Sequence, residues 1–160
     1  MPLRKAAIPA VLVLLAGAAY WWWMRPERQI QAILDDVAAA FTHDATDSGL
    51  ESLAAVAALR PLLADDVSIE GPGSARIDGR EEVVTAAARV RAGSQRLRVR
   101  FFDPEMTLTG DASATVTVTS EVATGTESGQ DLIDVHRVTA TLHRIANRWV
   151  VSSARIASGD

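Results

Sequence analysis

The sequence predicts an α+β domain in which a curved, cone-shaped antiparallel sheet packs on about three helices, preceded by one transmembrane helix. Three observations lead to this prediction. Residues 6–24 carry no charge, the next part of the chain has apolar residues at helical spacing, and the part from Leu97 onward alternates apolar and polar residues. A sheet with one apolar face needs helices to cover that face. We therefore expect an anchor over residues 1–25 and a folded domain over residues 26–160.

The composition limits the classes of function that the domain can have. The chain has 160 residues, so the part after the uncharged segment has the length of one ordinary domain. The formal net charge of the chain is −4, which gives no electrostatic reason to expect that it binds nucleic acid. It contains no cysteine. Disulfides, thiolate metal sites and a cysteine nucleophile are therefore excluded.

The uncharged segment from Ala6 to Met24 predicts a helix that crosses the lipid bilayer. Its nineteen residues span about 28 Å as a helix, close to the roughly 30 Å hydrocarbon core of a bilayer. Four aromatic residues, 20–23, lie at its C-terminal end, where such rings favour the headgroup layer. The alternative is a signal peptide cleaved near residues 16–18, but the mature chain would then begin beside three tryptophans.

The balance of basic residues around this segment indicates its orientation. Arg4, Lys5 and the chain amine precede it, whereas Arg25 and Arg28 follow it, and the small excess favours an N-terminus on the inside. We therefore expect a single-pass protein of a bacterial-type inner membrane, with the domain on the extracytoplasmic side.

Three segments predict the helices of the domain. The first follows Pro26, the second begins with a capping box at Ser48 and Glu51, and the third begins at Asp78, which can cap it, and stops at Gly93. We expect the apolar residues at helical spacing to face the sheet. They are Ile30, Ile33, Leu34, Val37, Ala38 and Phe41 in the first helix, Leu50, Leu53, Val56 and Ala57 in the second, and Val83, Val84, Ala87 and Val90 in the third.

Strands are predicted for the other segments. Residues 67–70 and 75–77 form a short hairpin around a glycine-rich turn, and the alternating segments 97–102, 106–108, 114–122, 132–144 and 148–156 form the main sheet. Alternation assigns one set of side chains to the core face, where helix residues Leu34 and Phe41 join them and Trp149 packs against the last hairpin. The strand members of that set are Val116, Val118, Val138, Ala140 and Leu142.

Three stretches resemble the nuclear transport factor 2-like superfamily and its SnoaL-like members. They are residues 62–73, residues 77–83 at the entry to the third helix, and residues 142–151 in the last hairpin, and the likeness extends over about residues 28–157. The resemblance implies a conical cavity with ligand-binding residues Val37, Phe41, Val138 and Ala140 in its lining. Families on this fold isomerise, cyclise or dehydrate small molecules, or only bind a ligand or a protein, so the fold does not define the activity.

The ketosteroid isomerase pattern of that superfamily is not met in this chain. The resemblance places the general base of those enzymes at Gly71, their tyrosine hydroxyl at Val37, and their protonated acid near Thr139 and Ala140. None of the three groups is present, so we do not expect that chemistry.

Asp134 and His136 are the candidate catalytic residues. Period two places both side chains on the face of Val138, nearer the cavity mouth, and an imidazole beside a carboxylate can serve as a general acid or base. The alternative is that they lie at a half-exposed strand end, or form hydrogen bonds to helix termini, with no chemical role.

The other two histidines, His43 and His143, do not indicate a catalytic or metal site. His43 follows the first helix, where it can cap the C-terminus or lie at the cavity rim, and His143 points away from the core. His136 and His143 are seven residues apart on one strand and face opposite ways, so we expect no metal and no cofactor.

The outer face of the sheet carries a basic surface at Arg96, Arg98, Arg100 and Arg137. It is either solvated or a contact for a second copy, a membrane protein or lipid headgroups. The sequence thus favours a membrane-anchored accessory or ligand-binding domain that performs no catalysis. The alternative is a small pocket enzyme, an isomerase, dehydratase or cyclase, that uses Asp134 and His136.

Overall fold

The computed structural model describes residues 13–15, 17, 25–126 and 130–158. Internal contacts divide the chain into two units, residues 1–32 and 33–160. The expected membrane anchor, residues 6–24, lies largely outside the described residues. Its described residues Val13–Leu15 and Gly17 are helical, and within the described part of the chain no helix is long and apolar enough to span a bilayer.

Three α-helices form in the segments that the periodicity predicted. They are α2 (Pro26–Phe41), α3 (Gly49–Ala57) and α4 (Arg80–Ala92), with 3-10 turns at Arg60–Leu62 and Pro72–Ser74. The capping box that opens α3 is confirmed: Ser48 Oγ accepts from the Glu51 backbone at 3.2 Å, and the Glu51 carboxylate accepts from the Ser48 backbone at 2.7 Å. That second hydrogen bond lowers the pKa of Glu51.

Three of the helix details predicted from the sequence are wrong. Leu50 and Leu53 of α3 are 80% and 68% exposed, because this short helix buries only Val56. Asp78 does not cap α4; it ends a strand, and its carboxylate accepts from Arg76 Nε at 2.8 Å. Val90 is 49% exposed, because α4 turns the following residue, an arginine, into the protein.

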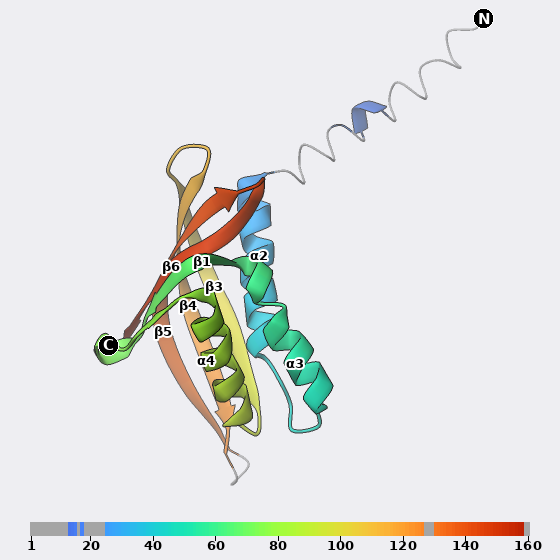
Figure 1. The fold of residues 1–160 in the computed structure, drawn as a ribbon, viewed down its shortest axis with the longest axis vertical. Helices are drawn as coiled ribbons and strands as arrows, with labels where there is room; N and C mark the ends of the chain where they lie inside the picture. Colours follow the sequence, from blue (N-terminus) through green and yellow to red (C-terminus); the bar gives the residue numbers. More distant parts are fainter. Residues whose placement is uncertain (1–12, 16, 18–24, 127–129, 159–160) are drawn as a thin grey trace, which may run out of the picture. The chain divides into compact units, whose positions relative to one another are not determined.

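Six strands form one sheet. They are β1 (Leu63–Glu70), β2 (Arg76–Asp78), β3 (Leu97–Leu108), β4 (Ser113–Gly125), β5 (Asp131–Ile145) and β6 (Arg148–Ser158), in the spatial order β2-β1-β6-β5-β4-β3. Figure 1 shows α4 lying across one face of this sheet.

The expectation of a purely antiparallel sheet is wrong, because β1 pairs with β6 in parallel. Every other pair is antiparallel. Antiparallel neighbours are joined by short turns that the sequence displays, such as Ala146 and Asn147 at positive φ between β5 and β6. The partners β1 and β6 are separated by most of the domain, so no local signal indicates their pairing.

Two strands extend beyond their predicted bounds, and both have an irregular register. β1 begins at Leu63 rather than at Val67, with an irregular register before Ser68. β3 runs without a break past Pro104, where the register shifts and Asp103 takes a φ of 51°. A bulge inserts an extra residue, and the period-two pattern is lost at that point.

The predicted core forms on one face of the sheet. Val116, Val118, Ala140 and Leu142 are buried, and Trp149 on the last hairpin is 4% exposed. Val138 and Phe41 are only half-buried, because both line a cavity.

Candidate functional site

An apolar cavity of about 120 Å³ lies between α2 and the inner face of the sheet, within residues 33–160. Every side chain that lines it is a hydrocarbon. The lining residues are Ile33, Leu34, Val37, Phe41, Leu59, Leu63, Ile69, Val83, Phe101, Val116, Val118, Val138, Ala140, Leu142, Val151 and Ala154. The four residues predicted to line a cavity, Val37, Phe41, Val138 and Ala140, are all among them.

Strand register and helix periodicity bring these residues together. Val116 pairs with Ala140 and Val118 pairs with Val138, so β4 and β5 present adjacent apolar pairs to the same space. Val37 and Phe41 are one helical turn apart on α2 and close the cavity from the other side. The small side chain of Ala140 is one reason why the space is not filled.

Among the described residues, none that lines the cavity can transfer a proton. Acid–base catalysis needs a titratable side chain within hydrogen-bond reach of the reacting atoms. Val37 and Ala140, the positions at or near which the resemblance places the hydroxyl and the acid of ketosteroid isomerases, are both in the lining and both apolar. The lining itself can bind a small apolar molecule through contact and exclusion of water, but it cannot perform acid–base chemistry.

Asp134 and His136 lie beyond the cavity on the same strand face as Val138, and neither is part of its lining. Asp134 is exposed, and His136 is half-buried. His136 Nδ1 is buried without a hydrogen-bond partner among the described residues, so the Asp134 carboxylate does not accept from this nitrogen. The two residues share a face, as predicted, but the structure does not join them through Nδ1.

Sequence reasoning missed Ser120, which lies opposite His136 on β4. Ser120 is only 5% exposed, which is unusual for a serine. The row Phe101–Ser120–His136 runs across three strands directly beyond the cavity residues Val118 and Val138. Alternation along β4 places Ser120 on the face of Val116 and Val118, and this signal was present in the sequence. Its position opposite His136 depends on the register of β4 against β5, which cannot be read from either strand alone.

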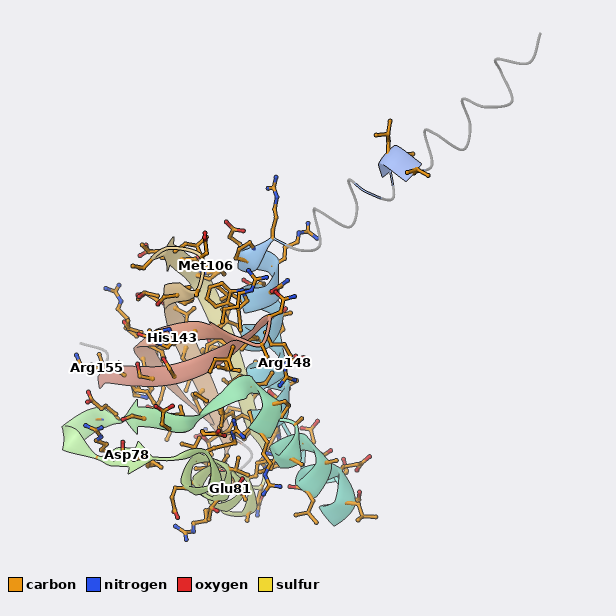
Figure 2. The ribbon with its side chains drawn as sticks, turned by 45° about the horizontal axis from the view of Figure 1, so that its top comes forward. Asp78, Glu81, Met106, His143, Arg148 and Arg155 are labelled. Atoms are coloured by element: carbon orange, nitrogen blue, oxygen red, sulfur yellow. The ribbon has the colours of Figure 1, made fainter. Side chains whose placement is uncertain are left out.

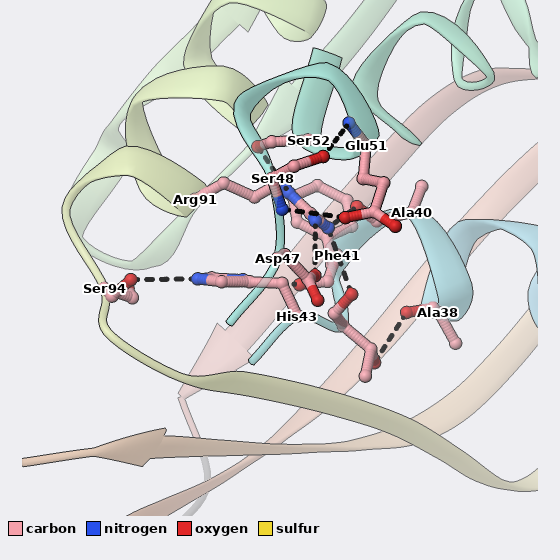
Figure 3. A network of polar contacts seen from close by, with 11 residues as sticks. Ala38, Ala40, Phe41, His43, Asp47, Ser48, Glu51, Ser52, Arg91 and Ser94 are labelled. Atoms are coloured by element: carbon pink, nitrogen blue, oxygen red, sulfur yellow. Dashed lines mark hydrogen bonds and ion pairs between the residues drawn. The ribbon is translucent and has the colours of Figure 1, made fainter. Parts of the chain in front are cut away.

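A second polar group surrounds Arg91, which is 4% exposed (Figure 3). Its guanidinium donates to the carbonyls of Ala40 at 2.6 Å and Thr42 at 3.0 Å, and to Ser52 Oγ at 3.1 Å. Asp47 lies 3.4 Å from it and supplies a counter-charge. These partners come from the end of α2, the following loop and α3, so Arg91 of α4 fastens three segments together.

His43 also belongs to this region and not to the cavity lining. Its Nε2 donates to the Ser94 carbonyl at 2.8 Å, since a carbonyl can only accept, and its backbone forms a bridge to Leu97 (Figure 3). His43 therefore ties the end of α2 to the start of β3.

The outer face of the sheet carries the predicted basic residues on β3 and β5. Arg98, Arg100 and Arg137 are exposed there, while Arg96 lies 3.6 Å from Asp131. His143 is exposed on the same face, as predicted (Figure 2). Within the described residues, no group of three His, Asp or Glu side chains could hold a metal ion.

The mixed six-stranded sheet, its three helices and the apolar cavity define a cystatin-like α+β domain of the nuclear transport factor 2-like class. The sequence profile of the SnoaL-like domain family matches residues 30–155, and the chain belongs to this family. No curated protein matches the chain.

Similar solved structures share the fold. A nuclear transport factor 2-like protein with a cystatin-like fold from Novosphingobium aromaticivorans is 18% identical, with a TM-score of 0.70, over 89% of this chain and 88% of that chain. An uncharacterised cystatin-like protein from Caulobacter vibrioides is 16% identical, with a TM-score of 0.65, over 82% and 87%. A proposed dehydratase of the nuclear transport factor 2-like family from Streptomyces avermitilis is 20% identical, with a TM-score of 0.66, over 82% and 94%. At these identities the likeness establishes the fold alone.

Proposed function

We propose that this chain is a membrane-anchored SnoaL-like domain that binds a small apolar ligand in its cavity and performs no catalysis. The observation that carries the proposal is the chemistry of the cavity, since all sixteen lining residues are hydrocarbons. Apolar cavities of roughly 150 Å³ in other proteins stay dry and bind benzene or xenon. A cavity of about 120 Å³ suits a ligand of that size or slightly smaller.

Acid–base catalysis by Asp134 and His136 is the less favoured function. The carboxylate is exposed, and the imidazole nitrogen Nδ1 has no partner among the described residues. In a catalytic pair of this kind, the imidazole is oriented by a hydrogen bond that its ring N–H donates to the carboxylate. SnoaL-like relatives include proposed dehydratases, but those activities belong to their own sites.

The anchor is the second part of the proposal. It rests on the nineteen uncharged residues from Ala6 to Met24 and on the aromatic residues at their end. An anchor of this kind would hold the cavity close to a bilayer, which is itself a store of small apolar molecules.

The cavity proposal is tested by NMR of methyl groups in the full-length chain, with benzene or xenon as the probe. Binding should shift the methyl signals of Val37, Val116, Val138 and Leu142 in a saturable way. Ala140→Val should weaken that binding, because the added methyl groups occupy part of the cavity. Thr117→Val, on the outer face of the adjacent strand, exchanges a hydroxyl for a methyl group outside the cavity and should leave binding unchanged.

The opposite pattern would overturn this function. If the probe shifts the exposed Leu50 and Leu53 and spares the cavity methyl groups, it only partitions onto the surface. Thermal unfolding of Ala140→Val, recorded in parallel, separates a filled cavity from a damaged fold.

A further inference from the structure

The outer face of the sheet holds two adjoining hollows that the apolar cavity does not include. They have volumes of about 300 and 460 Å³ and share the side chains of Glu70 and Arg155. One lies over β1, β6 and β5, and the other lies between the end of β6 and the glycine-rich turn after β1. Figure 2 shows Arg155 on β6 and Asp78 on β2 at this side of the sheet.

The floor of the first hollow is lined with hydroxyl groups. Register places Ser68, Ser153 and Thr141 side by side on β1, β6 and β5, so one row of three hydroxyls crosses the strands. Thr139 lies in the next row, opposite Arg155. Neighbouring strands are about 4.8 Å apart, so each hydroxyl can reach a different oxygen of one small ligand. Each hydroxyl can donate or accept, which matches the alcohols of a polyol.

Charged side chains form the wall of both hollows. Register aligns Arg76, Glu70 and Arg155 on β2, β1 and β6, so a single carboxylate lies between two guanidinium groups. Arg155 Nε donates to Glu70 at 2.7 Å, whereas the nearest Arg76 nitrogen is 4.0 Å from Glu70. Arg76 binds Asp78 instead, and the hydrogen bonds of Asp78 with Arg76 and with the Ser68 side chain lower the pKa of Asp78.

Arg155 is the group in this wall that is free to bind a ligand. Its side chain is 73% exposed, and its only hydrogen bond to a described residue uses Nε. The two terminal nitrogens of the guanidinium therefore remain available. A guanidinium with that edge open binds a carboxylate or phosphate through two parallel hydrogen bonds.

We propose that these hollows bind a hydroxylated organic anion, a compound of the sugar-acid class, on the outer face of the sheet. Its carboxylate occupies the terminal nitrogens of Arg155, and its hydroxyls contact Glu70 and the row of Ser68, Ser153 and Thr141. An apolar ligand does not suit this surface, because the first hollow offers hydroxyls and charges. A second copy of the chain does not suit it either, because the centre of a stable protein interface is depleted of charge and rich in apolar area.

The test is an NMR titration of the ¹⁵N-labelled full-length chain in a non-ionic detergent, with glucuronate as the probe. Saturable shifts are expected at the backbone amides of Thr139, Thr141, Ser153 and Arg155. Glucose has the same ring without the carboxylate and should bind about tenfold more weakly, which is the effect of one charge-assisted contact.

Two variants decide whether Arg155 carries the binding. Arg155→Gln should weaken glucuronate binding about tenfold. Arg100→Gln removes the same charge from the same face on β3, three strands away, and should leave binding unchanged. Both positions are exposed, and an unchanged melting temperature would show that the fold is intact.

Four results would overturn the proposal. They are no saturable shift, equal binding of glucose, equal weakening by Arg100→Gln, or shifts at these amides that follow protein concentration and not glucuronate. The last result would instead assign the face to a second copy of the chain. None of them bears on the apolar cavity, whose own test uses a different probe and different residues.

Discussion

Leu142 is among the largest side chains that the protein encloses completely, with 1% of its surface exposed. It lies opposite the fully buried Ala114 on β4 and opposite Val151 on β6, and it lines the apolar cavity. Ile145, three residues further along the same strand, is 54% exposed. The strand therefore offers a buried and an exposed aliphatic residue for direct comparison.

Truncation of Leu142 should destabilise the protein strongly. Leu142→Ala removes buried contacts and enlarges an existing cavity, so we expect a loss of about 2–5 kcal/mol in the free energy of unfolding. Urea unfolding followed by circular dichroism measures this change. Ile145→Ala serves as the control and should change stability by well under 1 kcal/mol. A loss below about 1 kcal/mol for Leu142→Ala would mean that this side chain is not enclosed.

At the residue scale, the sequence predicted the core face better than the polar residues near it. Period two assigns Val116, Ala140 and Leu142 correctly, because strand geometry fixes which side chains share a face. Period two also places Ser120 on that face, but its position opposite His136 depends on the register of β4 against β5, which neither strand shows alone. The burial of Arg91 likewise follows from carbonyl partners on other elements, which its own helix does not reveal.

Helix α4 is linked to α2, to the loop after it and to α3 by hydrogen bonds of Arg91. One buried guanidinium satisfies the carbonyls of Ala40 and Thr42 at the end of α2 and a hydroxyl of α3. Carbonyls at a helix C-terminus have no partner within the helix, so each needs one from elsewhere. Arginine supplies several donors in a fixed planar arrangement, which lysine cannot reproduce.

Removal of the Arg91 side chain should destabilise the packing of these helices. Arg91→Ala leaves two carbonyls without partners at about 1–3 kcal/mol each, so we expect a loss of at least about 2 kcal/mol. Urea unfolding gives the value, and hydrogen exchange of α3 and the loop before it should accelerate. Arg89→Ala, an exposed position on the same helix, removes the same charge and should have little effect. An equal loss in the free energy of unfolding for both variants would show that helix propensity, and not the hydrogen bonds of Arg91, determines the effect.

The sequence predicted which helices and strands exist and their order along the chain. Its errors about their bounds and buried residues have physical causes. Leu50 and Leu53 fit helical spacing, yet α3 is too short to bury more than Val56. The strands β1 and β3 extend beyond their predicted bounds, and each contains an irregular register, which interrupts the alternation that sequence reasoning uses.

For the whole molecule, the apolar residues at the N-terminus predict attachment to a membrane. Full-length chain in membrane fractions should resist extraction by carbonate and by high salt, because the free energy of inserting nineteen uncharged residues does not depend on ionic contacts. Immunoblotting of the washed membranes measures this. A double variant, Leu14→Arg with Leu15→Arg, should become extractable, because each charge at the centre of a span costs about 2.5–3.5 kcal/mol. Recovery of a soluble chain that begins near Ala19 would instead establish a cleaved signal peptide.

The parallel pairing of β1 with β6 has a consequence for how the protein is made. The strand β1 has two neighbours, β2 and β6, and β6 is synthesised last of the six strands. One edge of the β1–β2 hairpin therefore stays unpaired until β6 exists. Ribosomes add about 5–20 residues per second, so the roughly eighty residues between the two strands take several seconds to appear. During that interval an unpaired edge invites association with other nascent chains. The pairing of β1 with β6 therefore forms only after β6 has been synthesised, and chaperones that shield strand edges have their greatest effect before that point.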